Sequence, residues 1–170
     1  MAVAARPRPT RAALTYALAT APLNDRTLTA IGLGSGMPFY TIDLPYLWGR
    51  LTADRRLIMG AGLIWGSADE LETLDINEGE SRALLERLEA RIRMLNPALE
   101  AVSVTHRWAG PIAIPDGQAP QIGRLAGASN IFVASGYAGH GVALSVTAGR
   151  LVARAIIEGA SLPRWADPSA

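Results

Sequence analysis

The segment IFVASGYAGHGVALSVTAGRLVARAI, from Ile131 to Ile156, decides how the C-terminal part of this sequence folds. Its first five residues, IFVAS, are a continuous apolar run, which predicts a short strand buried on both faces of a sheet. The stretch from about Val142 to Glu158 is rich in alanine and predicts a helix, with Gly159 as its stop. Between them, Gly136 to Gly141 contains three glycines, which predicts a sharp turn from strand to helix.

The turn leaves two interpretations open. Glycines remove side chains from a surface and permit positive φ, and a following helix directs its unpaired N–H groups and the positive end of its dipole at that surface. A planar, electron-accepting ring that becomes anionic on reduction suits such a surface. The alternative is a tight connection that contacts no ligand, and the turn residues alone do not decide between the two.

The chain before this segment predicts an antiparallel meander and one amphipathic helix. Residues 100–114 are expected to form a further strand, whereas residues 66–80 and 115–130 are expected to be a polar turn and a loop. The predicted helix spans residues 81–95 and ends at Asn96-Pro97. Its apolar stripe consists of Leu84, Leu85, Leu88, Ile92 and Leu95. The strands of the meander are expected at residues 14–23, 27–33, 38–43, 46–51 and 56–63.

Composition excludes several classes of function. The 170 residues are 49% hydrophobic, enough for one sizeable core or parts of two smaller ones, and a net charge of +1 without a basic stripe argues against a nucleic-acid partner. All 16 basic residues are arginine, so the chain supplies no Schiff-base or phosphate-loop lysine. The absence of cysteine excludes disulfides, thiolate nucleophiles and zinc–thiolate sites. No apolar run approaches about 20 residues and no secretory signal pattern is present, so a cytoplasmic protein without a membrane span is expected.

Other candidate motifs are weak. GLGSGM, Gly32–Met37, lacks the third fingerprint glycine and is followed by a strand-like segment, which argues against dinucleotide binding. His106 and His140 have no acidic residues at ligand spacing, so no metal site is predicted. Ser135 does not lie in a G-x-S-x-G elbow, which argues against acyl transfer. Aromatic residues could wall a pocket for a flat ring or an aliphatic amine, although core packing explains each one equally well; they are Tyr40, Tyr46, Trp48, Trp108 and Tyr137.

Three segments taken together identify a relationship. YLWGRLTADRRLIMGAG (46–62), HRWAGPIAIPDGQAPQIGRL (106–125) and NIFVASGYAGHGVALSVTAGRLVARAI (130–156) follow one another in a characteristic order and spacing. In this they resemble the C-terminal half of the FAD-dependent oxidoreductases of the D-amino-acid oxidase superfamily. Glycine oxidase, sarcosine oxidase and γ-glutamylputrescine oxidase belong to that superfamily, and the pattern is most similar to the last of these.

The resemblance implies an α+β fold. An antiparallel substrate-domain sheet with one amphipathic helix is expected over residues 12–127. Residues 128–160 are expected to be a strand–helix segment of an incomplete FAD-binding, Rossmann-like domain. Residues 1–11 are expected to be unstructured and residues 161–170 to form a tail. In the family, the glycine-rich fingerprint for the FAD pyrophosphate lies in an N-terminal half, and nothing before Leu14 supplies it, so the chain is expected to be a partial enzyme that needs this flavin-binding half in cis or in trans.

The resemblance also assigns site residues. The turn is expected to pass beside the flavin ring, with the N–H groups of Val142 and Ala143 directed at the pyrimidine edge of the ring. No catalytic side chain and no metal ligand is implied. The residues expected to bind the FAD cofactor are Gly110, Gly136, Gly139, His140, Gly141, Val142 and Ala143. The residues expected to line the substrate pocket are Tyr40, Trp48, Trp108, Ile112 and Tyr137.

Departures from the family pattern bear on the substrate. Relatives that oxidise amino acids hold the substrate carboxylate with an arginine or a lysine at the positions of Ile112 and Ala143, which are uncharged here. The resemblance implies oxidation of a C–N bond of an amine or amino acid to an imine, and the uncharged positions favour an amine with a distant carboxylate over a small α-amino acid. The alternative is a non-catalytic remnant or a subunit that pairs with a separate flavin-binding chain. In addition, the predicted hairpin turn has Asp54-Arg55 where Asp-Gly is usual.

Overall fold

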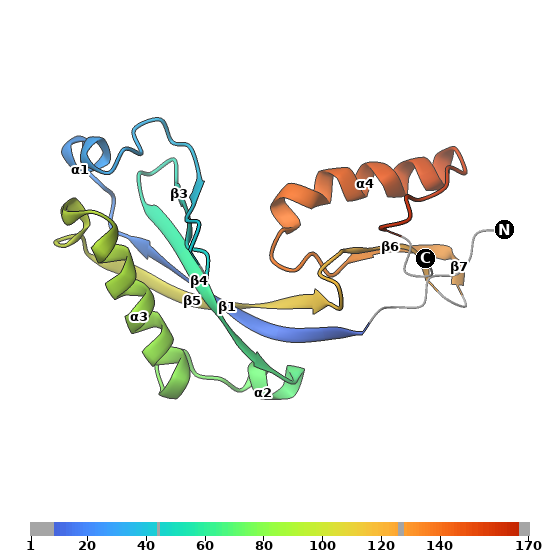
Figure 1. The fold of residues 1–170 in the computed structure, drawn as a ribbon, viewed down its shortest axis with the longest axis horizontal. Helices are drawn as coiled ribbons and strands as arrows, with labels where there is room; N and C mark the ends of the chain where they lie inside the picture. Colours follow the sequence, from blue (N-terminus) through green and yellow to red (C-terminus); the bar gives the residue numbers. More distant parts are fainter. Residues whose placement is uncertain (1–8, 44, 126–127, 167–170) are drawn as a thin grey trace. The chain divides into compact units, whose positions relative to one another are not determined.

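The computed structural model describes residues 9–43, 45–125 and 128–166, and these divide between two compact units (Figure 1). Unit 1 comprises Met1–Ala13, Trp65–Ala68 and Ile112–Ala170, and unit 2 comprises Leu14–Ile64 and Asp69–Pro111. The mixture of helices with sheets agrees with the α+β class predicted from the sequence.

A five-stranded sheet has the strand order β2-β3-β4-β1-β5. Strands β2, β3 and β4 follow one another as antiparallel neighbours, which confirms the last three strands of the predicted meander. The sheet joins segments far apart in sequence, because β1 lies between β4 and β5. The strands are β1 (Thr10–Thr20), β2 (Phe39–Tyr40), β3 (Trp48–Leu51), β4 (Leu57–Gly66) and β5 (Val104–Pro115).

The turn between β3 and β4 forms without the usual glycine. Arg55 takes its place in the left-handed region, with φ of 67°. This conformation is unfavourable for a residue with a side chain, and two contacts help to hold it. The carbonyl oxygen of Arg55 accepts a hydrogen bond from the N–H group of Leu23 at 2.8 Å, and its guanidinium pairs with Asp25.

The amphipathic helix is confirmed as α3, Gly79–Leu95. Three residues of the predicted stripe, Leu85, Leu88 and Ile92, are buried, and Asn96 ends the helix before Pro97. Leu95 is 43% exposed, because it is the last helical residue. The structure adds a polar contact that periodicity cannot indicate. The hydroxyl groups of Tyr16 and Ser81, both fully buried, lie 2.8 Å apart and link β1 to α3.

Two predictions in unit 2 and at its border are wrong. Residues 27–33 were expected to form a strand, but α1 occupies Asp25–Ala30. The side chain of Asn24 caps this helix by accepting a hydrogen bond from the N–H group of Thr27 at 2.8 Å, and this local bond favours helix over strand. The polar turn expected at residues 66–80 contains the short helix α2, Ala68–Glu72, with acidic residues in its first turn.

In unit 1, the loop predicted for residues 115–130 is also wrong. It contains β6, Gln121–Leu125, which pairs antiparallel with β7, Ala128–Ser135. β6 has one fully buried apolar side chain, Ile122, which is too little for a strand to be recognised from alternation. The predicted burial of IFVAS on both faces does not hold within this chain, since Ile131 is 46% exposed and β6 is the neighbour of β7 in their two-stranded sheet.

The ends of the described chain are ordered. Residues 1–8 of the predicted unstructured segment lie outside the described residues, but β1 already begins at Thr10. The predicted final helix is confirmed as α4, Gly141–Ile157, and Gly159 follows it with φ of 65°. Of the predicted tail, residues 167–170 lie outside the described residues, and Ala166 is buried.

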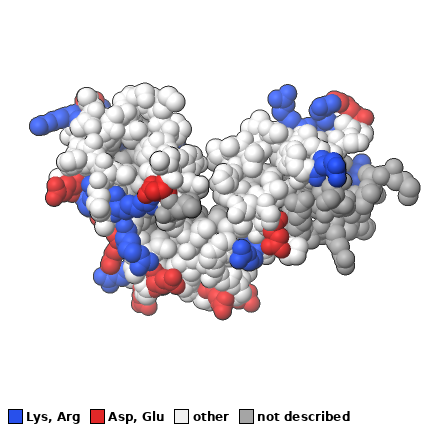
Figure 2. Space-filling model, viewed as in Figure 1, with Lys and Arg blue, Asp and Glu red and all other residues white. Residues whose placement is uncertain are grey.

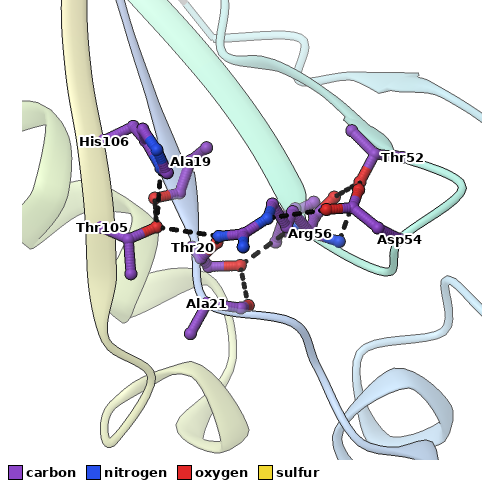
Figure 3. A network of polar contacts seen from close by, with 9 residues as sticks. Ala19, Thr20, Ala21, Thr52, Asp54, Arg56, Thr105 and His106 are labelled. Atoms are coloured by element: carbon purple, nitrogen blue, oxygen red, sulfur yellow. Dashed lines mark hydrogen bonds and ion pairs between the residues drawn. The ribbon is translucent and has the colours of Figure 1, made fainter.

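A polar network ties β1, β4 and β5 together in unit 2 (Figure 3). The guanidinium of Arg56 donates to the carbonyl oxygen of Thr20 at 3.2 Å, to Oγ1 of Thr105 at 3.1 Å and to Asp54 at 2.7 Å. Hydrogen bonds from Thr52 and from Arg56 lower the pKa of Asp54. Oγ1 of Thr105 also lies 2.8 Å from Nδ1 of His106. One of the two histidines is therefore part of a structural network.

Glu89 links α3 to β5. Its carboxylate pairs with Arg93 at 2.7 Å and with Arg107 of β5. Burial acts to raise the pKa of Glu89, but the hydrogen bonds from Arg93 and Arg107 outweigh it, so the pKa lies below the usual value of 4.5. A carboxyl group whose pKa is lower in the folded state stabilises the fold above its unfolded pKa, and that contribution is lost as the pH falls through the folded pKa.

We therefore expect Glu89→Gln to lower the melting temperature of the chain at pH 7, and we expect this loss to shrink as the pH falls through the folded pKa of Glu89, which lies below 4.5. Thermal unfolding followed by circular dichroism from pH 3 to pH 7 measures this difference. Glu72→Gln is the control, because Glu72 is an exposed residue at the end of α2. An equal loss at both pH values would contradict the role assigned to the Glu89 ion pairs.

Candidate functional site

The turn between β7 and α4 is built on left-handed backbone. Gly136 has φ of 71° and Gly139 has φ of 84°, and Ala138 between them has φ of 49°. Glycine adopts these angles without steric cost, whereas the alanine is strained. The left-handed backbone therefore explains why positions 136 and 139 are glycine. It does not explain the glycine at position 141, because φ of Gly141 is not positive.

The end of β5 lies along this turn within unit 1. The N–H group of Ala138 donates to the carbonyl oxygen of Ala113 at 3.3 Å. A Cβ atom added to Gly136 would lie 3.2 Å from the ring of Pro115, and one added to Gly139 would lie 4.0 Å from Cδ1 of Ile112. Ile112 is a predicted site residue, whereas Ala113 and Pro115 are not, because backbone and ring contacts of this kind leave no pattern in sequence.

The turn leads directly into the N-terminus of α4. His140 is the N-cap residue, and its side chain makes no capping hydrogen bond. Its carbonyl oxygen accepts from the N–H groups of Ala143 at 3.1 Å and Leu144 at 3.0 Å. The Ala143 N–H group, expected from the sequence to face the cofactor, is thus used inside the helix. Gly141 and Val142 stand at the position where a helix directs N–H groups outward, and Val142 is 96% exposed.

The charge distribution along α4 favours an anionic or electron-rich ligand at its beginning. From Gly141 to Gly149 the helix has no charged residue, and its charges are Arg150, Arg154 and Glu158. Figure 2 shows charged side chains over the C-terminal end of α4 and uncharged surface over the rest of it. The positive end of the helix dipole is therefore not offset by a carboxylate in the first turn.

The remaining predicted pocket residues belong to unit 2. Tyr40 and Trp48 are cross-strand partners in β2 and β3, and Tyr40 is 69% exposed. The ring of Trp48 covers Gly60 of β4, so that tryptophan also has a packing role. Trp108, 38% exposed, and Gly110 lie on β5, and a Cβ atom at Gly110 would have no neighbour within 4 Å. The structure thus groups Ile112 and Tyr137 with the turn in unit 1, and groups Tyr40 with Trp48 in unit 2.

The described residues of unit 1 fit one part of a flavin. The side-chain-free backbone of the turn and the start of α4 match an electron-accepting ring edge. The pyrophosphate requires a turn with the pattern G-x-G-x-x-G/A between a strand and a helix, and the turn before α4 has Leu144 at the third fingerprint position. GLGSGM follows helix α1 and precedes strand β2, so it does not have that arrangement. Among the described residues, no group of three or more histidine, aspartate or glutamate side chains could hold a metal ion.

Among the described residues, no helix combines the length and the apolar character needed to cross a membrane.

Comparison with known proteins places this geometry in context. The profile of the DAO family, described as FAD dependent oxidoreductase, matches residues 1–155. Probable oxidoreductase OrdL from Haemophilus influenzae is 32% identical over 142 residues, covering 84% of this chain and 29% of OrdL. Gamma-glutamylputrescine oxidoreductase from Escherichia coli is 36% identical over 114 residues, covering 65% of this chain and 24% of that protein. The chain thus spans less than a third of the length of these relatives.

Solved structures show the same fold. L-Proline dehydrogenase from P. horikoshii matches with a TM-score of 0.74 at 23% identity, covering 95% of this chain and 40% of the dehydrogenase. Glycine oxidase from Geobacillus kaustophilus matches with a TM-score of 0.65 at 18% identity, covering 92% of this chain and 37% of the oxidase. The fold described above therefore forms a part of larger chains in both structures.

Proposed function

Because the chain belongs to the DAO family of FAD dependent oxidoreductases, we propose that it is the substrate-domain part of a flavoprotein that oxidises a C–N bond of an amine or amino acid to an imine. The observation that carries the proposal is the turn Gly136–Gly141, in which left-handed glycine backbone leads into the exposed N-terminus of α4. FAD, when bound, supplies the acceptor for the hydride that leaves the substrate carbon.

The chain contributes position and electrostatics to this reaction. The turn presents backbone without side chains at Gly139 and Gly141, which allows close approach of a flat ring. The N–H groups of Gly141 and Val142 at the start of α4 stabilise negative charge on the nearby ring edge. Ile112 and Tyr137 add apolar surface beside the turn and help to exclude water. No acid–base pair is assigned, because transfer of a hydride to flavin asks the protein mainly for orientation.

The flavin-binding part is proposed to come from elsewhere, in cis or in trans. No described segment has the full strand, G-x-G-x-x-G/A turn and helix that hold a pyrophosphate, since the turn at Gly139 and Gly141 has Leu144 at the third fingerprint position. Among the described residues, β7 pairs with β6 alone in a two-stranded sheet, so its other edge can receive a further strand. Val142, Val146, Ile156 and Ile157 of α4 are exposed apolar side chains that such a partner would cover. "Complete flavoprotein" below means this chain together with that flavin-binding part.

The test of this proposal is flavin binding with and without the flavin-binding part. We expect the 170-residue chain alone to bind FAD weakly or not at all and to self-associate, since its β7 edge and α4 face are open. Titration by flavin fluorescence, combined with light scattering, measures both properties. The complete flavoprotein is expected to show the visible flavin bands. If the chain alone is a monodisperse monomer that binds FAD tightly, no separate flavin-binding part is required and the proposal is contradicted. If the complete flavoprotein shows neither flavin bands nor amine oxidation, the result supports a non-catalytic subunit instead.

The substrate is proposed to be an amine, or an amino acid whose carboxylate is far from the oxidised bond. Ile112 presents its Cδ1 atom toward Gly139, and Ala143 is a small residue on the first turn of α4. Neither offers a charge to pair with a carboxylate next to the reacting carbon. Burying an unpaired carboxylate there costs on the order of several kcal/mol.

We therefore expect steady-state kcat/KM of the complete flavoprotein to be higher for primary amines than for glycine or sarcosine. Ile112→Arg is expected to shift this ratio toward glycine by about tenfold or more, because a charge-assisted hydrogen bond to a carboxylate is worth about 1.5–3 kcal/mol. Ile112→Met is the matched control, which keeps the size of the side chain without a charge. Faster turnover of glycine than of every amine by the wild-type protein would overturn the assignment.

A further inference from the structure

The segment that follows α4 folds back onto the core of unit 1. It comprises residues 160–166 and is called the C-terminal clasp here. Gly159 reverses the chain in the left-handed conformation, and the N–H group of Ala160 donates to the carbonyl oxygen of Arg154 at 3.4 Å. A second reversal follows, in which the N–H group of Ala166 donates to the carbonyl oxygen of Pro163 at 2.9 Å. These two turns carry the chain from the end of α4 to β6.

The clasp forms a backbone contact with β6. The carbonyl oxygen of Ala166 accepts a hydrogen bond from the N–H group of Ile122 at 3.2 Å. Ile122 is paired with Ala134 of β7 in the register of the sheet, and its N–H group is used by the clasp. Each N–H group of a strand points to one edge. The clasp therefore occupies the edge of β6 that β7 does not.

The side chains of the clasp complete an apolar cluster. Ile122, Ala148 and Ala166 are buried at its centre, with exposed fractions of 0%, 1% and 1%. Leu162 of the clasp packs against this cluster, as do Tyr137, Leu151 and Val152. Tyr137 is a residue of the Gly136–Gly141 turn, and its ring lies 3.7 Å from the position of a Cβ atom at Gly141. The clasp and the turn thus share one cluster.

We propose that the C-terminal clasp is a positioning element for the Gly136–Gly141 turn, acting through Leu162 and Ala166. The clasp holds β6 and α4 on the cluster against which Tyr137 packs, and Tyr137 is itself a residue of the turn, so the cluster anchors the turn. The clasp lies beyond residue 155, where the match to the family profile ends. The proposed effect of the clasp on the turn depends on the structure alone. Its proposed effect on flavin also depends on the function proposed for the chain.

Amide hydrogen exchange of the 170-residue chain tests the structural part of this proposal. Leu162→Asn places a polar group in the cluster and is expected to speed exchange at Ile122 and across residues 137–144 by about tenfold or more, relative to wild type. Leu162→Met keeps an apolar side chain of similar volume and is expected to restore protection. Met94→Asn is the control, because Met94 is 85% exposed and lies outside the cluster.

Leu162→Ala serves as a milder truncation should the asparagine variant not fold, and it is expected to change exchange in the same direction. Folding of each variant is followed by circular dichroism. Unchanged exchange across residues 137–144 in a folded Leu162→Ala or Leu162→Asn protein would overturn the proposal, as would faster exchange confined to the clasp itself.

A second measurement connects the clasp to the cofactor. In the complete flavoprotein, Leu162→Asn is expected to shift the flavin reduction potential, because the N–H groups at the start of α4 lose their fixed position, while Leu162→Met leaves it at the wild-type value. Faster exchange with an unchanged potential overturns the positioning role toward flavin. If the wild-type complete protein binds no flavin, the proposed function fails, whereas the exchange result still decides whether the clasp positions the turn.

Discussion

Replacing Gly141 with valine is expected to lower the affinity of the complete flavoprotein for FAD by about 10- to 100-fold without unfolding the chain. Gly141 does not have positive φ, and a Cβ atom there would lie at an ordinary contact distance of 3.7 Å from Tyr137. The fold therefore tolerates a side chain at this position. A bound ring placed against the backbone does not, since overpacking of this kind costs about 1–3 kcal/mol, and each 1.4 kcal/mol is a factor of ten in affinity.

The contrast between Gly141 and Gly139 makes this test specific. Valine at Gly139 combines any clash with FAD with backbone strain, because φ is 84° there, so its effect on binding does not isolate the ring contact. Flavin fluorescence titration of Gly141→Val, with thermal unfolding of the same variant, separates binding from folding. Gly34→Val is the matched control, because a Cβ atom at Gly34 would have no neighbour within 4 Å. Wild-type affinity in Gly141→Val would show that the ring does not lie against this backbone.

The second large effect is expected on folding, at Gly60 in β4. A Cβ atom there would lie 2.5 Å from Cε2 of Trp48 and 2.7 Å from the backbone oxygen of Tyr16. The side chain of Trp48 could rotate away, but the oxygen belongs to the neighbouring strand β1 and cannot move without disrupting the sheet. We expect Gly60→Val to destabilise the chain by about 3 kcal/mol or more, at the upper end of the range for overpacked cores.

Urea unfolding of Gly60→Val, followed by circular dichroism and tryptophan fluorescence, measures this loss. Gly34→Val again serves as the control and is expected to change the free energy of unfolding by less than about 0.5 kcal/mol. The double variant Gly60→Val with Trp48→Ala distinguishes the two contacts. It is expected to remain destabilised if the backbone oxygen of Tyr16 dominates, and recovery to the level of Trp48→Ala alone would show that the ring is the main obstacle.

The parts of the fold predicted correctly from sequence are those that local pattern determines. The apolar stripe containing Leu85, Leu88 and Ile92 repeats at helical spacing and is buried as expected in α3. Gly159 stops α4 as predicted, because a left-handed residue ends a helix regardless of its surroundings. The turn Gly136–Gly141 was recognised from its glycines, and two of them do have positive φ.

The parts that were missed depend on contacts distant in sequence or on a single cap. Residues 27–33 have the composition of a strand, and one hydrogen bond from the side chain of Asn24 favours helix α1 instead. β6 has a single fully buried apolar residue, and pairing with β7 defines it as a strand. At the candidate site, Ala113 and Pro115 meet the turn through a carbonyl oxygen and a proline ring, and sequence spacing predicts neither contact.

The position of β1 between β4 and β5 also has a consequence for how the chain folds during synthesis. The β3–β4 hairpin closes locally through its own turn, so it can form as soon as both strands are made. Strand β1 ends at Thr20, but its second neighbour, β5, begins only at Val104. At a translation rate of 5–20 residues per second, one edge of β1 remains unpaired for roughly 4–17 seconds until β5 is synthesised. During that interval the unpaired edge of β1 can bind a chaperone, or pair with a second nascent chain, before β5 is available.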